Sequence, residues 1–135
     1  MTTTSLSARS PQADAPRRRS INADLAFWTT AGAVVAALSG PLAHWWGVPQ
    51  AVLLDGGLAF AILGPILLLV VNRTRPTRGL VAAFVVTNFL LAPLAAAAAW
   101  FGWPRLSGAG NWALADAAAV MLVLGTWQLT ALRRR

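Results

Sequence analysis

The sequence contains no cysteine, lysine, glutamate or tyrosine, and it has a single histidine. The lack of cysteine excludes disulfides, thiolate metal sites and cysteine nucleophiles. One histidine cannot supply a pair of ligands for zinc or haem, so we expect neither a metal nor a cofactor. Charged residues make up only 11% of the chain, against about 25% in typical soluble domains. The composition therefore does not indicate a soluble catalytic domain.

What the sequence does contain is apolar residues, which make up 57% of the chain. They form four long runs, at residues 25–46, 52–71, 80–103 and 112–132. A helix of about 20 apolar residues crosses the hydrocarbon core of a bilayer. We therefore expect an all-α membrane protein, a bundle of four transmembrane helices over residues 21–135 behind a disordered cytoplasmic tail, 1–20. The first run is longer than the apolar part of a usual signal peptide, so we expect it to be retained.

The arginines predict the orientation of this bundle. If both termini are cytoplasmic, ten of the eleven positive charges lie inside and only Arg105 lies outside, as the positive-inside rule requires. The net charge of +7 then reflects topology and attraction to anionic membrane lipids rather than nucleic-acid binding. A composition rich in alanine, arginine and proline suggests a bacterial source, and hence the cell membrane as the location.

A short motif occurs twice, as WWGVP at 45–49 and as WFGWP at 100–104. Downstream of each motif an Asp, a Gly and an Arg follow at spacings of nine residues. The two sets are Asp55, Gly64 and Arg73, and Asp116, Gly125 and Arg134. This pattern predicts a duplicated helical hairpin, about 21–73 and 79–135, whose copies run parallel because both begin in the cytoplasm. The Trp residues fit the membrane interface, where Gly and Pro turn the chain.

Acids inside the bilayer are the main candidates for function, because a charge at the centre of a span costs about 2.5–3.5 kcal/mol. Asp55 and Asp116 each lie an estimated 7–9 Å, about five or six residues, inside the outer end of a helix. His44 falls at a similar depth before the first turn. In an enzyme these three residues would be catalytic; otherwise the acids stabilise helix starts through the macrodipole. Asp24 is interpreted as a helix cap or first-turn acid.

Three further features concern contacts rather than catalysis. Asn88, near mid-membrane, needs a hydrogen-bond partner, which Thr30 or Gln128 could supply; a substrate contact is the alternative. Trp45 and Trp100 fit an interfacial belt, with an aromatic ligand cage as the alternative. Small residues also form a ridge that lets helices approach closely, within one chain or between two. These residues are Gly32, Ala36 and Gly40.

Three functions stay open from the sequence. The first is a noncatalytic accessory or partner-binding subunit, in contact with membrane lipids and with another membrane protein or a second copy of the chain. The second is a membrane-embedded acid/base enzyme, an isomerase or cyclase, that uses Asp55 and Asp116 on a lipophilic isoprenoid-like molecule. The third is a small carrier. Acids that share one cavity would favour the enzyme.

Overall fold

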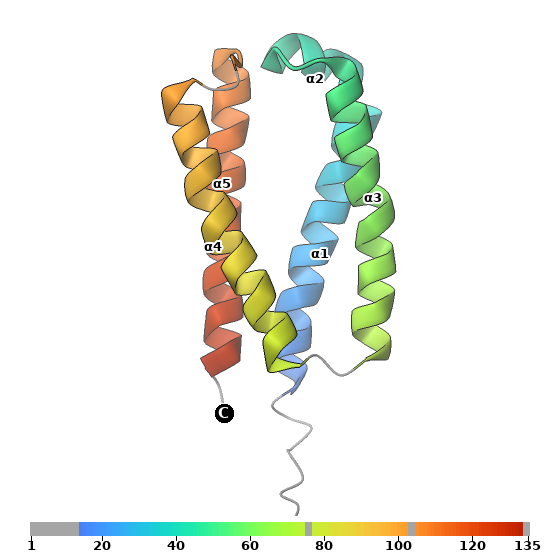
Figure 1. The fold of residues 1–135 in the computed structure, drawn as a ribbon. Helices are drawn as coiled ribbons and strands as arrows, with labels where there is room; N and C mark the ends of the chain where they lie inside the picture. Colours follow the sequence, from blue (N-terminus) through green and yellow to red (C-terminus); the bar gives the residue numbers. More distant parts are fainter. Residues whose placement is uncertain (1–13, 75–76, 103–104, 134–135) are drawn as a thin grey trace, which may run out of the picture.

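A computed structural model describes residues 14–74, 77–102 and 105–133, and these form five helices (Figure 1). The helices are α1 (Asp14–Ala37), α2 (Ser39–Trp46), α3 (Gln50–Arg73), α4 (Arg78–Phe101) and α5 (Gly108–Arg133). Three of them, α3, α4 and α5, are long and apolar enough to cross a membrane, and α1 with α2 makes a fourth candidate if the bent pair is one span. The prediction of an all-α membrane protein is confirmed.

The first apolar run is not one straight helix. The chain bends by 88° between α1 and α2, at Leu38. Pro41 lies in the first turn of α2, where its missing N–H is not needed, whereas its ring would clash with the carbonyl of Ala37 if α1 continued. The short α2 therefore lies across the end of the molecule (Figure 1).

The first helix also begins earlier than the sequence predicts. It starts at Asp14, so residues 14–20 are helical and do not belong to the predicted disordered tail. Residues 1–13 lie outside the described part of the chain. Asp24 is ten residues inside α1, and its interpretation as a cap or first-turn acid is wrong.

Helices α1 and α3 pack closely because glycines face each other between them. A Cβ atom on Gly57 would lie 2.6 Å from the carbonyl oxygen of Gly32 and 2.7 Å from the nitrogen of Ala36. Gly64 likewise leaves no room for a side chain beside Thr29. Gly32 and Ala36 of the small-residue ridge are thus used inside the chain, and α1 and α3 form the first hairpin.

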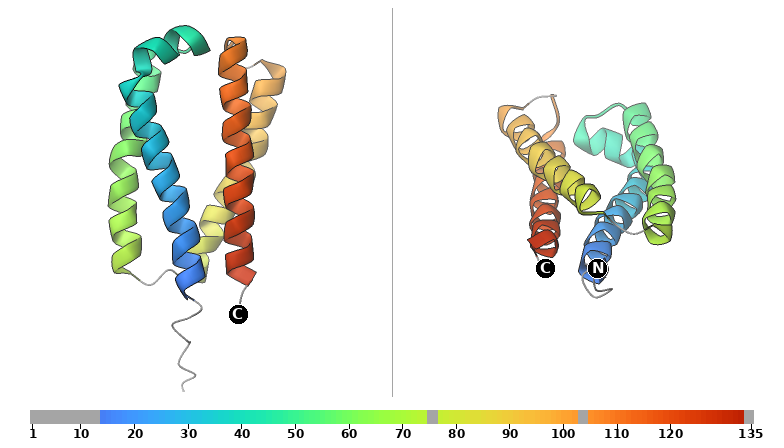
Figure 2. Two further views of the ribbon diagram at one scale, coloured as in Figure 1. Left: turned by 180° about the vertical axis from the view of Figure 1, so that it is seen from behind. Right: turned by 60° about the horizontal axis from the view of Figure 1, so that its bottom comes forward.

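Helices α4 and α5 form the second hairpin, which meets the first at the end of the molecule that carries most of the arginines (Figure 2). We call this the arginine end. Helices α1 and α4 begin there and α3 and α5 finish there, and arginines lie at each of these helix ends. Apolar side chains from the four long helices, α1, α3, α4 and α5, fill its core: Ile21, Leu25, Val71 and Val81, with Leu132 packed against them. The two hairpins diverge from this core toward the opposite end (Figure 1).

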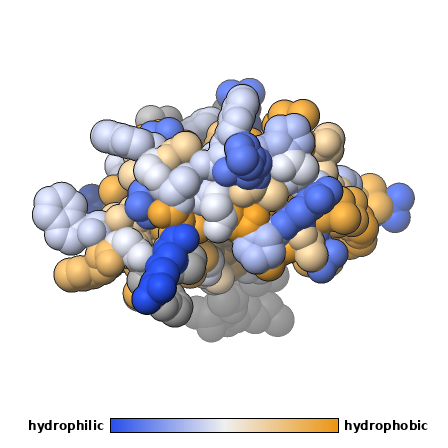
Figure 3. Space-filling view, turned by 90° about the horizontal axis from the view of Figure 1, so that it is seen from above, coloured by the Kyte–Doolittle hydropathy of each residue, from blue (hydrophilic) through white to orange (hydrophobic). Residues whose placement is uncertain are grey.

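At the opposite end, which we call the α2 end, α2 bridges the two hairpins by packing on both α3 and α5. The backbone N–H of Ser107 donates to the carbonyl of Trp46 at 2.9 Å, and the Ser107 hydroxyl donates to the carbonyl of Trp45. Gly110 leaves no room for a Cβ beside the Trp46 carbonyl. Seen from this end, much of the surface is pale or blue, with apolar atoms gathered mainly toward the edges of the view (Figure 3).

Candidate functional site

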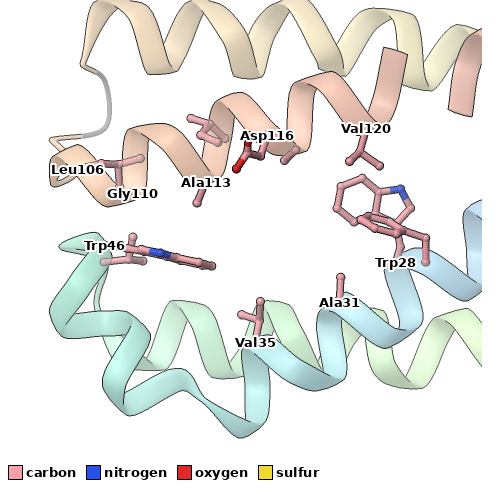
Figure 4. A pocket seen from close by; sticks show the side chains of 13 residues that line it. Trp28, Ala31, Val35, Trp46, Leu106, Gly110, Ala113, Asp116 and Val120 are labelled. Carbon is pink, nitrogen blue, oxygen red and sulfur yellow. The ribbon is translucent and has the colours of Figure 1, made fainter. Parts of the chain in front are cut away.

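A cavity of about 480 Å³ lies between α1, α2 and α5, where the hairpins diverge (Figure 4). Its lining is apolar except for one acid, and three of its side chains are aromatic. The lining includes Phe27, Trp28 and Val35 of α1, Trp46 of α2, and Ala113, Asp116, Ala117 and Val120 of α5. This volume falls within the range of about 300–1,000 Å³ that small-molecule sites occupy.

Helical spacing explains why α1 lines this cavity with one face. Trp28, Ala31 and Val35 follow one another at intervals of three and four residues, which places them on the same side of a helix. The indole of Trp28 is held by neighbouring rings. Its centroid lies 5.1 Å from that of Phe27 in an edge-to-face arrangement and 5.8 Å from that of Phe60 on α3. The first hairpin thus supplies a fixed aromatic wall.

Asp116 brings the one charged group to this cavity. Figure 4 shows its carboxylate on α5 between the indole of Trp46 on one side and that of Trp28 on the other. Asp116 is exposed, and within the described residues it has no hydrogen-bond or ion-pair partner. The cavity therefore has an apolar body and one negative point, with no positive group of the lining to balance it.

A second group of polar residues lies closer to the arginine end and joins three helices. Asn88 of α4 donates to Oδ2 of Asp24 at 2.9 Å and to the side-chain oxygen of Gln128 of α5 at 3.1 Å. Gln128 also donates to Oδ2 of Asp24 at 2.5 Å. The exposed fractions are 2% for Asp24, 5% for Asn88 and 0% for Gln128. We call these three residues the polar triad; it ties α1 to the second hairpin.

A smaller cavity of about 250 Å³ lies beside the triad, between α1, α3 and α4. Asp24, Thr87 and Asn88 line part of it, and the rest is apolar, with Phe60 and Phe84 among the lining residues. Trp28 lines both cavities. The charged group here, the carboxylate of Asp24, already accepts hydrogen bonds from Asn88 and Gln128, whereas Asp116 in the α1–α2–α5 cavity has no such partner among the described residues.

The candidate site residues from the sequence fall in different places. His44, Asp55 and Asp116 are all exposed, and no hydrogen bond or ion pair between described residues joins them. Of these three, only Asp116 lines either of the two cavities. Asp55 belongs to α3, which does not pack against α5, so the two acids do not share a cavity. Within the described ranges, no three His, Cys, Asp or Glu side chains come together as a metal site.

The residues expected to contact a substrate are also divided. Trp45 and Trp100 are 64% and 86% exposed and line neither cavity. Asn88 is buried in the polar triad, and Gln128, one of its two expected partners, is indeed bonded to it. Sequence reasoning missed the role of Asp24 and of Trp28. Their spacing of four residues, which continues back to Ser20, was a signal for one inward side of α1, on which Ser20 and Asp24 are buried and Trp28 is half-buried.

Comparisons of the chain with protein-family models, with curated proteins and with solved structures find no match.

Proposed function

We propose that this protein is a noncatalytic membrane protein that binds a lipophilic molecule between its two hairpins. The observation that carries the proposal is the α1–α2–α5 cavity, whose size and aromatic, apolar lining suit such a molecule. The cavity lies where the hairpins diverge, so a molecule dissolved in the membrane can approach it from between the helices. The glycine contacts of the first hairpin and the polar triad hold its walls in place.

The same geometry favours binding over acid/base chemistry. An isomerase or cyclase needs a proton donor and an acceptor near one substrate, and the cavity lining holds one ionisable side chain, Asp116. Asp55 lies on a helix that does not contact α5. A purely partner-binding role loses part of its support, because Gly32 and Ala36 pack within the chain. A carrier would use the same cavity and would differ only in moving its ligand across the membrane.

The proposal includes four spans with both termini in the cytoplasm of a bacterial cell. The bent pair α1 and α2 then counts as the first span, in which α2 rests in the outer interface. The distribution of arginines supports this orientation. Of those in the described residues, Arg105 alone belongs to the connection at the α2 end, and the others belong to segments at the arginine end.

A duplicated hairpin is also part of the proposal. Gly64 and Gly125, which correspond in the sequence repeat, are both buried against the preceding long helix of their own hairpin. Gly64 faces Thr29 of α1, and a Cβ atom on Gly125 would lie 3.2 Å from the Cβ of Asn88 on α4. Close helix approach at equivalent positions supports a common origin for the two hairpins.

The binding proposal can be tested with a neutral photoprobe, an alkane that carries a benzophenone. In nanodiscs it should label cavity residues of α1, α2 and α5 in a saturable way, so that an excess of unlabelled alkane removes the labelling. Ala117→Leu fills the cavity from α5 and should abolish the saturable labelling. Ala119→Leu is the matched control, because Ala119 is exposed and does not line the cavity. Labelling that never saturates, or that both variants leave unchanged, would contradict the proposal.

A further inference from the structure

The charge of the α1–α2–α5 cavity points to the class of ligand. Its thirteen lining residues include one charged group, the carboxylate of Asp116, and no arginine or histidine. Asp116 has no partner among the described residues. A ligand with one positive charge would supply the missing partner, whereas a neutral ligand would leave the carboxylate beside apolar surface, which is unfavourable.

The aromatic residues add a second attraction for a cation. The indoles of Trp28 and Trp46 lie on either side of Asp116 along the cavity (Figure 4). The face of an indole attracts a cation through its quadrupole, most strongly when water is displaced. A cation held at Asp116 therefore lies between two such rings, and an apolar body attached to it can fill the space lined by Ala113, Ala117 and Val120.

We infer that this cavity selects a free lipophilic monocation, such as an alkylammonium compound, whose charge pairs with Asp116 between Trp28 and Trp46. The inference rests on the proposed binding function. A phospholipid with an amine headgroup fits less well, because its phosphate would come close to Asp116 and the two anions would repel each other. A dication fits less well too, because its second charge would meet apolar side chains.

The test compares two probes of the same shape, phenylbutyltrimethylammonium and its uncharged carbon isostere, which has a tert-butyl group in place of the trimethylammonium. Each displaces the neutral photoprobe from nanodiscs made of phosphatidylglycerol, which carries no choline group. Asp116→Asn should raise the half-displacement concentration of the cation about tenfold and should leave that of the isostere unchanged or lower it. Asp55→Asn is the matched control and should change neither value, since Asp55 is exposed and lines neither cavity.

The other outcomes separate the two proposals. If Asp116→Asn weakens both probes equally, or neither, the charge of Asp116 does not select the ligand and this inference is wrong, while the binding function stands. If the photoprobe shows no saturable site in the wild-type protein, the binding function itself fails. If nanodiscs of phosphatidylcholine abolish displacement by the cation, a lipid headgroup occupies the site and the choice of a free cation is overturned. Asp116→Glu, which keeps the charge, should retain the preference for the cation.

Discussion

Replacing Gly57 by alanine should loosen the first hairpin. The new Cβ would lie 2.6 Å from the carbonyl oxygen of Gly32 and 2.7 Å from the backbone nitrogen of Ala36. Both are backbone atoms, so no side-chain rotation can relieve the clash. Ordinary van der Waals contact begins at 3.4 Å, and α1 and α3 must therefore separate by about 0.8 Å at this point. Such overpacking costs about 1–3 kcal/mol.

Gly56 provides a matched control one residue away. A Cβ atom there meets nothing within 4 Å, so Gly56→Ala keeps the packing and adds only the helical preference of alanine, at most about 1 kcal/mol in favour of the fold. The same gain offsets part of the cost at Gly57. We expect Gly57→Ala to lower the free energy of unfolding by about 1–2 kcal/mol, and Gly56→Ala to leave it unchanged or raise it.

The measurement is unfolding of the purified protein by titration of the mild-detergent sample with sodium dodecyl sulfate. Tryptophan fluorescence reports the transition, because Trp28 packs against Phe60 across the same helix pair, with their ring centroids 5.8 Å apart. Separation of α1 from α3 changes the surroundings of this indole. Equal stability of the two alanine variants would refute the close packing of α1 against α3 at Gly57.

Three other predictions concern topology, the polar triad and the α2 end. A reporter that is active only in the cytoplasm should work when fused after Arg135, and activity there of a reporter that works only outside would refute the orientation. Asn88→Ala should lower the free energy of unfolding by about 1–3 kcal/mol, because it removes a buried donor. Asn72→Ala, the control, loses an exposed bond to Asn22 and should lower it by less than about 1 kcal/mol. Equal losses in the two variants would contradict the role of the polar triad. Ser107→Ala removes the side-chain bond to Trp45 and should speed hydrogen exchange of the α2 amides, so unchanged exchange would speak against that contact.

The three long apolar helices α3, α4 and α5 could be predicted because run length alone carries that information. The bend before α2 could not be predicted in this way, since residues 25–46 are apolar on both sides of it. Pro41 was a signal but not a sufficient one, because Pro65 and Pro93 lie inside helices that continue through them. What distinguishes the bend is the docking of α2 on α5, a contact between segments about 60 residues apart that no local pattern contains.

The candidate site was predicted only in part, for a related reason. Asp116 was identified because an acid in an apolar run stands out. Asp24 was misplaced because the helix was expected to begin near Ser20, which put the acid in a first turn. Whether an acid in a span faces a cavity, another helix or the outside depends on how the helices rotate and pair. That arrangement follows from contacts such as those of Gly57 and Asn88, which sequence spacing does not reveal.

The polar triad also has a consequence for the order in which the protein is made. Asp24 is synthesised first, and its two donors follow 64 and 104 residues later. The glycine contacts between α1 and α3 can form as soon as α3 has emerged, so the first hairpin can assemble while Asp24 still lacks its amides. A chain interrupted after Arg73 would carry this acid without either donor. Until the ribosome has passed Gln128, the growing chain therefore places in the bilayer an Asp24 carboxyl group that lacks at least one of its two donors.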